Sequence, residues 1–367
     1  MRIDEVELRL VELPYRMPFK TSFSSEEGKV AIIVTVRSEG MEGYGEGTMD
    51  PFPFYREECT VGAWHLLQHA FAPDLLQHGC EHPSELSARW ARWRGNPMAK
   101  TALEAAVWDC YARQRGVPLR SLLGGERTEI PVGASLGMSS IPETVENVAR
   151  HVEQGYKRVK LKIEPGWDID LLAAVRGRFP DIELTVDANS AYTLGQIDTL
   201  RAIDEFGLHY IEQPLHWDDM VEHAQLATMI RTELCLDETL TSPTRVRDAL
   251  DMKACSVVNV KVARVGGVQS VREIHEMCVA RNVPMWCGGM LETGVGRSLN
   301  IHLATMPGFV FPGDTASASR TYVRDIVEQH LEATNGIMPV PEGAGTGVTL
   351  DRPFLDEVTS MTEVVRA

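Results

Sequence analysis

The sequence predicts an α/β fold: a modified (β/α)8 barrel of the TIM type with an N-terminal α+β capping domain. Two observations indicate this class. Beyond residue 125, eight short apolar runs alternate with stretches of helical periodicity, which is the order of a parallel barrel. Before that point, strand-like runs come first and helix-like runs second. We therefore expect a capping domain over 1–125, a barrel over 126–322 and a C-terminal segment over 323–367 that returns to the capping domain.

The capping domain is expected to begin with an antiparallel meander. Three runs with a period of two, separated by Gly and polar turns, predict its strands: MRIDEVELRLVEL, KVAIIVTVRSEG and EGYGEGTM. The clearest helix of the domain is predicted from Pro97 to Gly116, because apolar residues recur at helical spacing and a glycine ends the pattern.

Eight runs predict the barrel strands: IPVGASL, RVKLKI, IELTVDAN, LHYIEQP, ELCLDE, SVVNVKVA, VPMWCGG and FVFPGD. Helices are expected between successive runs. The first of them has a clear start, since Ser140 and Glu143 form the S-x-x-E pattern of a capping box.

Composition excludes several classes of protein. The 367 residues carry a formal net charge of −16, which argues against a nucleic-acid binder and against attraction to anionic membranes. Seven cysteines with no C-x-x-C spacing indicate reduced thiols in a cytoplasmic protein. No apolar run approaches the ~18 residues of a membrane span.

The feature that carries chemistry is a spacing. Lys162, Asp187, Glu212 and Asp237 follow one another at intervals of 25 residues, and Lys261 comes 24 residues later. One βα unit is about this long, so the five charges should occupy equivalent positions on five successive strands. They end the strand-like runs, and barrels build their active sites at the carboxyl ends of the strands.

The three carboxylates of this series, Asp187, Glu212 and Asp237, predict a metal site. Hard oxygen donors without His or Cys suit Mg²⁺, Mn²⁺ or another divalent cation of this kind, and do not suit Zn²⁺. The alternative is a site without metal, in which the carboxylates repel one another and one or two of them keep a proton.

The two lysines predict proton transfer. Lys162 and Lys261 fall on the second and sixth strands, which face each other across an eight-stranded barrel. Lys160 lies two residues before Lys162 and hence on the same face of the strand. Its charge, together with a metal, would lower the pKa of Lys162 toward the range of a general base. Two opposed amines fit a racemase and one suffices for an elimination. The alternative is that both lysines only pair with the carboxylates.

At these residues the sequence resembles the enolase superfamily, in particular its muconate-lactonizing-enzyme-like subgroup. Within that subgroup it is most similar to the o-succinylbenzoate synthase / N-acylamino acid (N-succinylamino acid) racemase family. The resemblance covers nearly the whole chain and is carried by these motifs: VKLKIEPGWD, TVDANSAYT, YIEQPL, CLDET, NVKVARVGG, WCGGMLETGVGR and PGDTASASR.

The resemblance implies roles for individual residues. Lys162 and Lys261 would be the acid/base pair, Lys160 the neighbour that tunes Lys162, and the three spaced carboxylates the Mg²⁺ ligands. Further residues would contact the substrate or support the ligands: Ser135, Asn189, Glu238, Gly289, Met290, Leu291 and Glu292. A lid that closes over the substrate would contain Phe19, Lys20, Thr21, Ser22 and Phe23.

The resemblance also implies the activity. A Mg²⁺-dependent enzyme would remove the proton α to a carboxylate of a small substrate, as o-succinylbenzoate synthase of menaquinone biosynthesis, with N-acylamino acid racemisation in the same site. The alternatives are a protein that is primarily a racemase, another cycloisomerase, or a non-catalytic metal-binding relative. A homo-oligomer is implied. Two departures bear on the acyl group: Thr321-Tyr322 replaces two aromatic residues, and the lid carries a lysine and serines.

Overall fold

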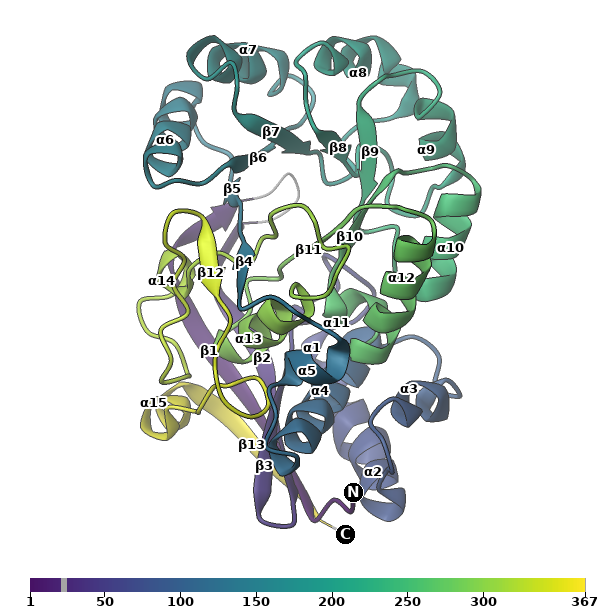
Figure 1. Cartoon of the computed structure of the whole chain (residues 1–367), viewed down its shortest axis with the longest axis vertical. Coiled ribbons are helices and arrows are strands. Elements are labelled where there is room, and N and C mark those ends of the chain that lie inside the picture. The colour runs from purple at the N-terminus through teal and green to yellow at the C-terminus, as the bar shows by residue number, and fades with distance from the viewer. Residues whose placement is uncertain (21–24, 367) are drawn as a thin grey trace.

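The computed structural model describes residues 1–20 and 25–366 and has two units (Figure 1). The N-terminal unit is built on an antiparallel sheet in the order β13-β1-β2-β3. Its strands are β1 (Glu5–Lys20), β2 (Ser25–Ser38), β3 (Met41–Gly47) and β13 (Thr359–Arg366). The predicted meander is confirmed by the pairing of β2 with both β1 and β3. The last strand of the chain, β13, pairs with β1 at the edge of this sheet.

The longest helix of this unit packs tightly on the sheet. Helix α4 (Pro97–Gln114) confirms the predicted helix. A Cβ atom at Gly43 would lie 2.3 Å from the Ala106 carbonyl oxygen, and one at Gly45 would lie 2.1 Å from that of Ala102. These glycines of β3 therefore permit a close approach of helix and strand. The smaller helices are α1 (Thr60–Leu66), a π-helix (Leu67–Phe71), α2 (Ala72–His78), α3 (Glu85–Trp90) and α5 (Leu119–Leu123).

The second unit is a curled sheet of parallel strands in the order β5-β6-β7-β8-β9-β10-β11, which forms the predicted TIM-like barrel as a half-barrel. Its strands are β5 (Ala134–Leu136), β6 (Arg158–Lys162), β7 (Glu183–Asp187), β8 (Tyr210–Glu212), β9 (Glu233–Leu236), β10 (Val257–Val260) and β11 (Met285–Cys287).

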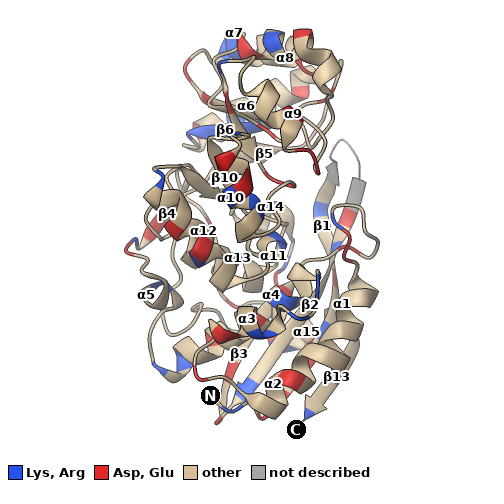
Figure 2. Ribbon diagram, turned by 90° about the vertical axis from the view of Figure 1, so that its right-hand side faces the viewer, with Lys and Arg blue, Asp and Glu red and all other residues tan. Residues whose placement is uncertain are grey.

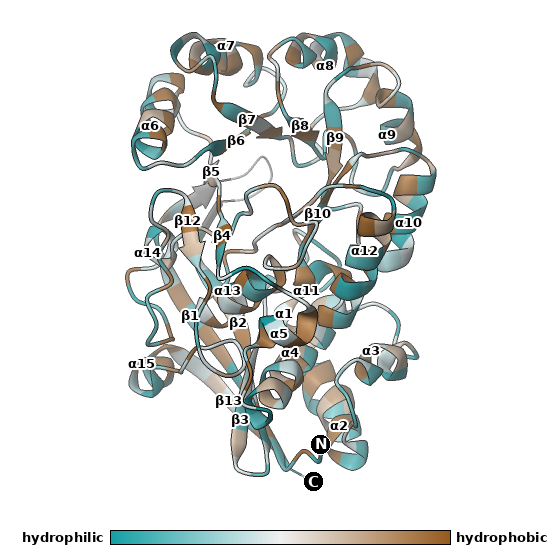
Figure 3. Cartoon of the chain, viewed as in Figure 1, coloured by the Kyte–Doolittle hydropathy of each residue, from teal (hydrophilic) through white to brown (hydrophobic). Residues whose placement is uncertain are grey.

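Helices line the outside of this sheet (Figure 1). The predicted capping box at Ser140 is confirmed at the start of α6, whose buried residues recur at the spacing of one helix face. Teal and brown alternate along the outer helices in Figure 3, as expected for amphipathic elements. They are α6 (Ile141–Glu153), α7 (Ile169–Arg178), α8 (Ile197–Asp204), α9 (Val221–Leu226), α10 (Pro243–Asp251) and α12 (Val268–Ala280). Three further helices contact the N-terminal unit: α11 (Val262–Val265), α13 (Gly294–Leu303) and α14 (Ala318–Thr321).

The eighth strand prediction, FVFPGD, is wrong. In the described chain this segment forms only single bridges, Phe309 with Met285 and Gly313 with Val132. Pro312 lacks an N–H and so cannot donate to a ladder at this point. The first predicted run also divides: its start, β4 (Glu129–Pro131), pairs with β12 (Ile337–Pro339), and only its end enters the barrel as β5.

Two glutamates of the N-terminal unit attach it to the barrel. Glu46 of β3 accepts hydrogen bonds at the start of α13, and Glu104 of α4 accepts them from Val268 and Gln269 at the start of α12. In Figure 2 basic and acidic residues interleave over both units. None of the helices described is both long and apolar enough to cross a bilayer. The remaining helix, α15 (Arg352–Val358), precedes β13.

Candidate active site

The spaced charges lie together at the carboxyl ends of the barrel strands. In the parallel register Lys162 is the partner of Asp187, and Asp187 is the partner of Glu212. Lys162 Nζ lies 2.7 Å from Asp187 Oδ2 and 2.6 Å from Asn189 Oδ1. Burial raises the pKa of Asp187, but Lys162 and Lys160 outweigh burial and lower it to about 2.

Lys160 occupies the same face of β6 one step deeper, as predicted. Its Nζ lies 2.9 Å from Glu212 Oε2, 3.4 Å from Asp187 Oδ2 and 2.6 Å from Asp314 Oδ2. Burial lowers the pKa of Lys160, yet these three carboxylates raise it to well above its usual value. Lys160 therefore stays a cation. Sequence reasoning missed Asp314 as its partner, although the residue ends the eighth apolar run.

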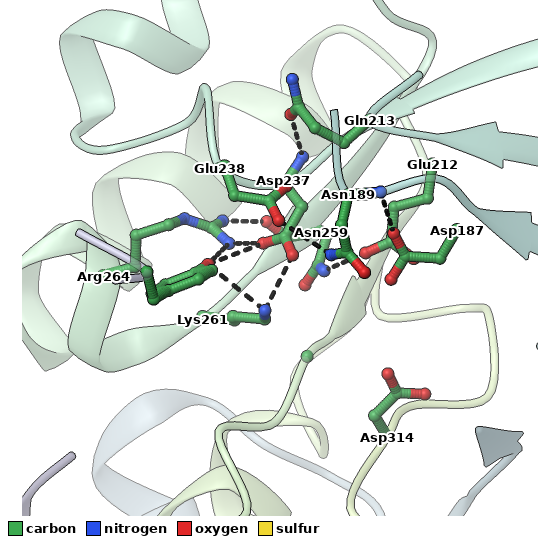
Figure 4. A network of polar contacts seen from close by, with 12 residues as sticks. Asp187, Asn189, Glu212, Gln213, Asp237, Glu238, Asn259, Lys261, Arg264 and Asp314 are labelled. Carbon is green, nitrogen blue, oxygen red and sulfur yellow. Dashed lines mark hydrogen bonds and ion pairs between the residues drawn. The ribbon is translucent and has the colours of Figure 1, made fainter. Parts of the chain in front are cut away.

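Lys261 follows β10, on the opposite flank of the site. Its Nζ lies 2.7 Å from Asp237 Oδ2 and 3.3 Å from the hydroxyl of Tyr55, which comes from the N-terminal unit. Arg264 donates to the other oxygen of Asp237 (Figure 4). Burial lowers the pKa of Lys261, but Tyr55 and Glu238 outweigh burial and raise it above its usual value. Sequence reasoning missed Tyr55 and Arg264, which have no place in the 25-residue spacing.

The other predicted carboxylates, Glu212 and Glu238, are buried and bind the amide side chains around the site. Glu212 is fully buried, and its Oε1 accepts from Asn259 Nδ2 at 2.8 Å. Glu238 accepts from Asn189 Nδ2 at 2.9 Å, and burial raises its pKa. Non-glycine residues with positive φ follow these strand ends, among them Asn189 at 41° and Gln213 at 39°. Such backbone strain concentrates at functional sites.

One pocket joins the two lysines. Lys162 and Lys261 both line it, together with Lys160, Asp187 and Asn189. Of the other residues predicted to contact the substrate or support the ligands, Glu238 is not among those that line the pocket, whereas the rest line it: Ser135, Gly289, Met290, Leu291 and Glu292. Both units contribute walls, the N-terminal one through Tyr15, Met17, Lys29, Asp50 and Tyr55, and the C-terminal part of the barrel through Arg297, Asp314, Ala316, Arg320 and Thr321. Of the predicted lid, Phe19 and Lys20 end β1, and Thr21, Ser22 and Phe23 lie outside the described residues.

The residues present fit a divalent metal by donor chemistry. Asp187 and Glu212 end β7 and β8, and Asp237 directly follows β9. Glu238 Oε2 is a buried carboxylate oxygen without a hydrogen-bond partner among the described residues. Hard oxygen donors of this kind are what Mg²⁺ prefers. As placed, each of the first three carboxylates instead holds a cationic side chain, and the described residues contain no group of three or more acidic, His or Cys side chains arranged around a common point.

The sequence matches known families over both units. Residues 4–124 match the N-terminal domain of the mandelate racemase / muconate lactonizing enzyme family, and residues 143–354 match the enolase C-terminal domain-like family. The chain belongs to the enolase superfamily. Enzymes of this superfamily generally use a divalent metal, in agreement with the donor set above.

Two members of the enolase superfamily show to which family within it the chain belongs. It is 48% identical over 360 residues to an N-succinylamino acid racemase of Thermus thermophilus, covering 98% of each chain. It is 44% identical over 366 residues to an o-succinylbenzoate synthase of Geobacillus kaustophilus, covering 99% of this chain and 98% of the other. A solved enolase-superfamily structure from Listeria innocua matches with a TM-score of 0.97 at 39% identity, over 100% and 99% of the two chains. The protein is thus an enzyme of the o-succinylbenzoate synthase / N-succinylamino acid racemase family, as the motifs predicted.

Proposed function

We propose that the protein removes the proton α to a carboxylate of a small substrate, as an o-succinylbenzoate synthase that also racemises N-acylamino acids. The observation that carries this proposal is that Lys162 and Lys261 line one pocket from different flanks, each hydrogen-bonded to a carboxylate of its own. Those carboxylates, Asp187 and Asp237, hold the two amines in place.

In the dehydration, the Cα–H bond breaks and the proton passes to the neutral amine of Lys162. The C–O bond to the leaving hydroxyl then breaks, and the proton returns from Lys162 to the hydroxide, so that water leaves and the amine is regenerated. Lys261 stays a cation beside the developing negative charge. Asp187, Glu212 and Asp237 would hold a divalent cation, which would supply further positive charge for the substrate carboxylate.

Racemisation is the second candidate for the main activity. It needs one base on each side of Cα, which the two pocket lysines provide, and an N-succinylamino acid racemase is 48% identical to this chain. One amine removes the proton from one side and the other amine returns a proton to the opposite side.

The two activities are separated by proton exchange in D₂O, followed by NMR. The wild type, Lys162→Ala and Lys261→Ala are each incubated with the hydroxylated cyclohexadiene precursor of o-succinylbenzoate and with both enantiomers of an N-succinylamino acid. Lys162→Ala should abolish dehydration. Lys261→Ala should lose exchange from one enantiomer only and keep most of the dehydration.

Two results would contradict the proposal. If the wild type neither exchanges nor turns over any N-acylamino acid, the racemase activity is excluded. If it also fails to turn over the cyclohexadiene precursor, a cycloisomerase or a non-catalytic metal-binding protein remains. Lys100→Met serves as the control, since Lys100 belongs to α4 and its Nζ binds the Trp93 carbonyl away from the pocket.

A further inference from the structure

Lys29 is a buried cation in the wall of the pocket with neutral partners only. It lies on β2, its exposed fraction is 4%, and it lines the pocket that contains the lysine pair. Its Nζ donates to the Thr48 carbonyl at 3.1 Å and to the Met290 carbonyl at 3.0 Å. Lys29 therefore spans the N-terminal unit and the barrel segment after β11.

This ammonium forms no ion pair within the described part of the chain. Among the described residues no carboxylate oxygen lies within 4.0 Å of Lys29 Nζ, the limit of an ion pair. An ammonium has three N–H donors and the two carbonyls occupy two of them. A buried charge without an opposite charge costs several kcal/mol of lost hydration, so an anion bound beside it is strongly favoured.

Two acids lie near Lys29, but neither contacts its ammonium directly. The charge of Lys29 lowers the pKa values of Glu46 and Asp50, but burial outweighs it. Burial raises the pKa of Glu46 to about 7 and also raises that of Asp50. Burial thus opposes the charged form of both carboxyl groups, and neither of them forms an ion pair with Lys29.

The three site lysines differ from Lys29, whereas Arg297 resembles it in having carbonyl partners and no ion pair within the described residues. Lys160, Lys162 and Lys261 each contact at least one carboxylate. Both terminal nitrogens of Arg297 are engaged by the carbonyls of Ala316 and Glu292. Arg320 also lines the pocket but is partly exposed, with its guanidinium 5.7 Å from the ring of Tyr156. Water therefore competes with any anion at Arg320 more than at Lys29.

We propose that Lys29 binds a second carboxylate of the substrate, the one at the end of its acyl arm, and so selects dicarboxylate substrates over analogues with an uncharged acyl group. The proposal rests on the proposed function, because succinyl substrates carry such a carboxylate in addition to the one beside the reacting carbon. Lys162 and Lys261 act at the reacting carbon of the substrate, and Lys29 binds the carboxylate at the other end of the acyl arm.

The test compares two substrates that differ only in this carboxylate, N-succinylphenylalanine and N-acetylphenylalanine, by α-proton exchange in D₂O. Lys29→Met should lower kcat/KM for the succinyl compound by about 10-fold or more, mainly through KM, and change the acetyl compound by about 2-fold or less. Lys29→Arg should restore most of the preference. Lys29→Gln keeps N–H donors for the two carbonyls without the charge, so it should behave like Lys29→Met.

Controls separate the proposal from its alternatives. Lys100→Met removes an ammonium of the same unit outside the pocket and should leave the preference unchanged. An equal loss on both substrates would assign Lys29 a structural role only and overturn the proposal. Loss of the preference in Arg320→Met, with Lys29→Met unaffected, would overturn it in favour of Arg320.

Calorimetric titration of the same two compounds keeps this test independent of turnover. If the wild type turns over neither compound, the racemase part of the proposed function fails, but tighter binding of the succinyl compound that disappears in Lys29→Met would still support the distal site. Equal binding of both compounds by the wild type would overturn it.

Discussion

Glu46 of the N-terminal unit caps the barrel helix α13 through Thr293. The hydroxyl of Thr293 donates to Glu46 Oε2 at 2.6 Å, and its backbone N–H donates to Oε1 at 3.0 Å. The N–H of Gly296 donates to the same carboxyl group at 2.8 Å. Since the first N–H groups of a helix have no partner within it, a side chain of one unit completes an element of the other.

The first prediction concerns the pH dependence of stability at Glu46. Burial raises its pKa from the ordinary 4.5 to about 7, and Glu292 adds to the rise. Between these values the folded protein binds more protons than the unfolded chain, so the free energy of unfolding falls as pH rises from about 4.5 to about 7. The full loss for one such group is about 3 kcal/mol.

Glu46→Gln should make this fall smaller. The measurement is urea unfolding at pH 5 and pH 8 for both proteins, and the quantity of interest is the difference between their pH dependences, because Glu58 and Glu104 also have pKa values raised to about 7. Identical pH dependences would show that Glu46 ionises as freely in the folded state as in the unfolded chain.

A second prediction concerns the contact of α4 with β3. Gly45→Ala would bring a Cβ atom to 2.1 Å from the Ala102 carbonyl oxygen and 2.7 Å from the Ala106 nitrogen. We expect a destabilisation of about 3 kcal/mol, measured by thermal unfolding. Gly177→Ala is the matched control: Gly177 lies within α7 with nothing within 4 Å of its added Cβ, so this change should stabilise by about 0.5–1 kcal/mol. Equal melting temperatures for the two variants would contradict the close approach.

A third prediction concerns Asp314 under the site. It lies 2.6 Å from Lys160 Nζ and 2.8 Å from Arg158 Nη2, and both cations are buried. Asp314→Asn leaves Arg158 without an ion-pair partner, and we expect a loss of about 3 kcal/mol in denaturant unfolding. The exposed pair of Arg178 and Glu146 provides the control, since Glu146→Gln should cost less than about 1 kcal/mol. A similarly small cost at Asp314 would mean that Arg158 finds a new partner.

The fourth prediction concerns metal removal. With the metal stripped by a chelator, proton exchange on the substrate should stop, and added Mg²⁺ should restore it. Because a ligand that binds only the folded state stabilises it, Mg²⁺ should also raise the melting temperature of the stripped wild type. Asp237→Asn should weaken this rise and Asp248→Asn, on the exposed side of α10, should not. If Mg²⁺ does not change the melting temperature of the stripped wild type, the three carboxylates do not form a metal site.

The sequence predicted those parts of the site that follow the barrel period. Lys162, Asp187 and Glu212 recur once per βα unit, and parallel strands in register bring such residues to one edge. The helix over Pro97–Gln114 was predictable for a similar reason, since apolar spacing and a terminal glycine are local signals.

Other parts needed the three-dimensional structure. Tyr55 lies 206 residues from Lys261 along the chain, and its contact depends on how the N-terminal unit docks. The sequence gives no sign that Lys29 is special, because only the structure shows that it is buried and forms no ion pair with any described residue. The eighth strand was predicted wrongly for a different reason. The segment around Phe309 is apolar, as a strand would be, but Pro312 interrupts the hydrogen-bond ladder.

The two helix caps made across the units also bear on how such proteins diversify. An N-terminal unit transplanted from a relative would leave the first turns of α12 and α13 exposed unless it carried acids where Glu46 and Glu104 stand. The barrel that receives such a unit would also have to keep Gly267, because a Cβ atom at this position would lie only 1.7 Å from Glu104 Oε2. Exchange of whole units is therefore constrained by these contacts, whereas a substitution in the pocket wall, at Lys29 or Thr321, leaves the residues of both caps unchanged.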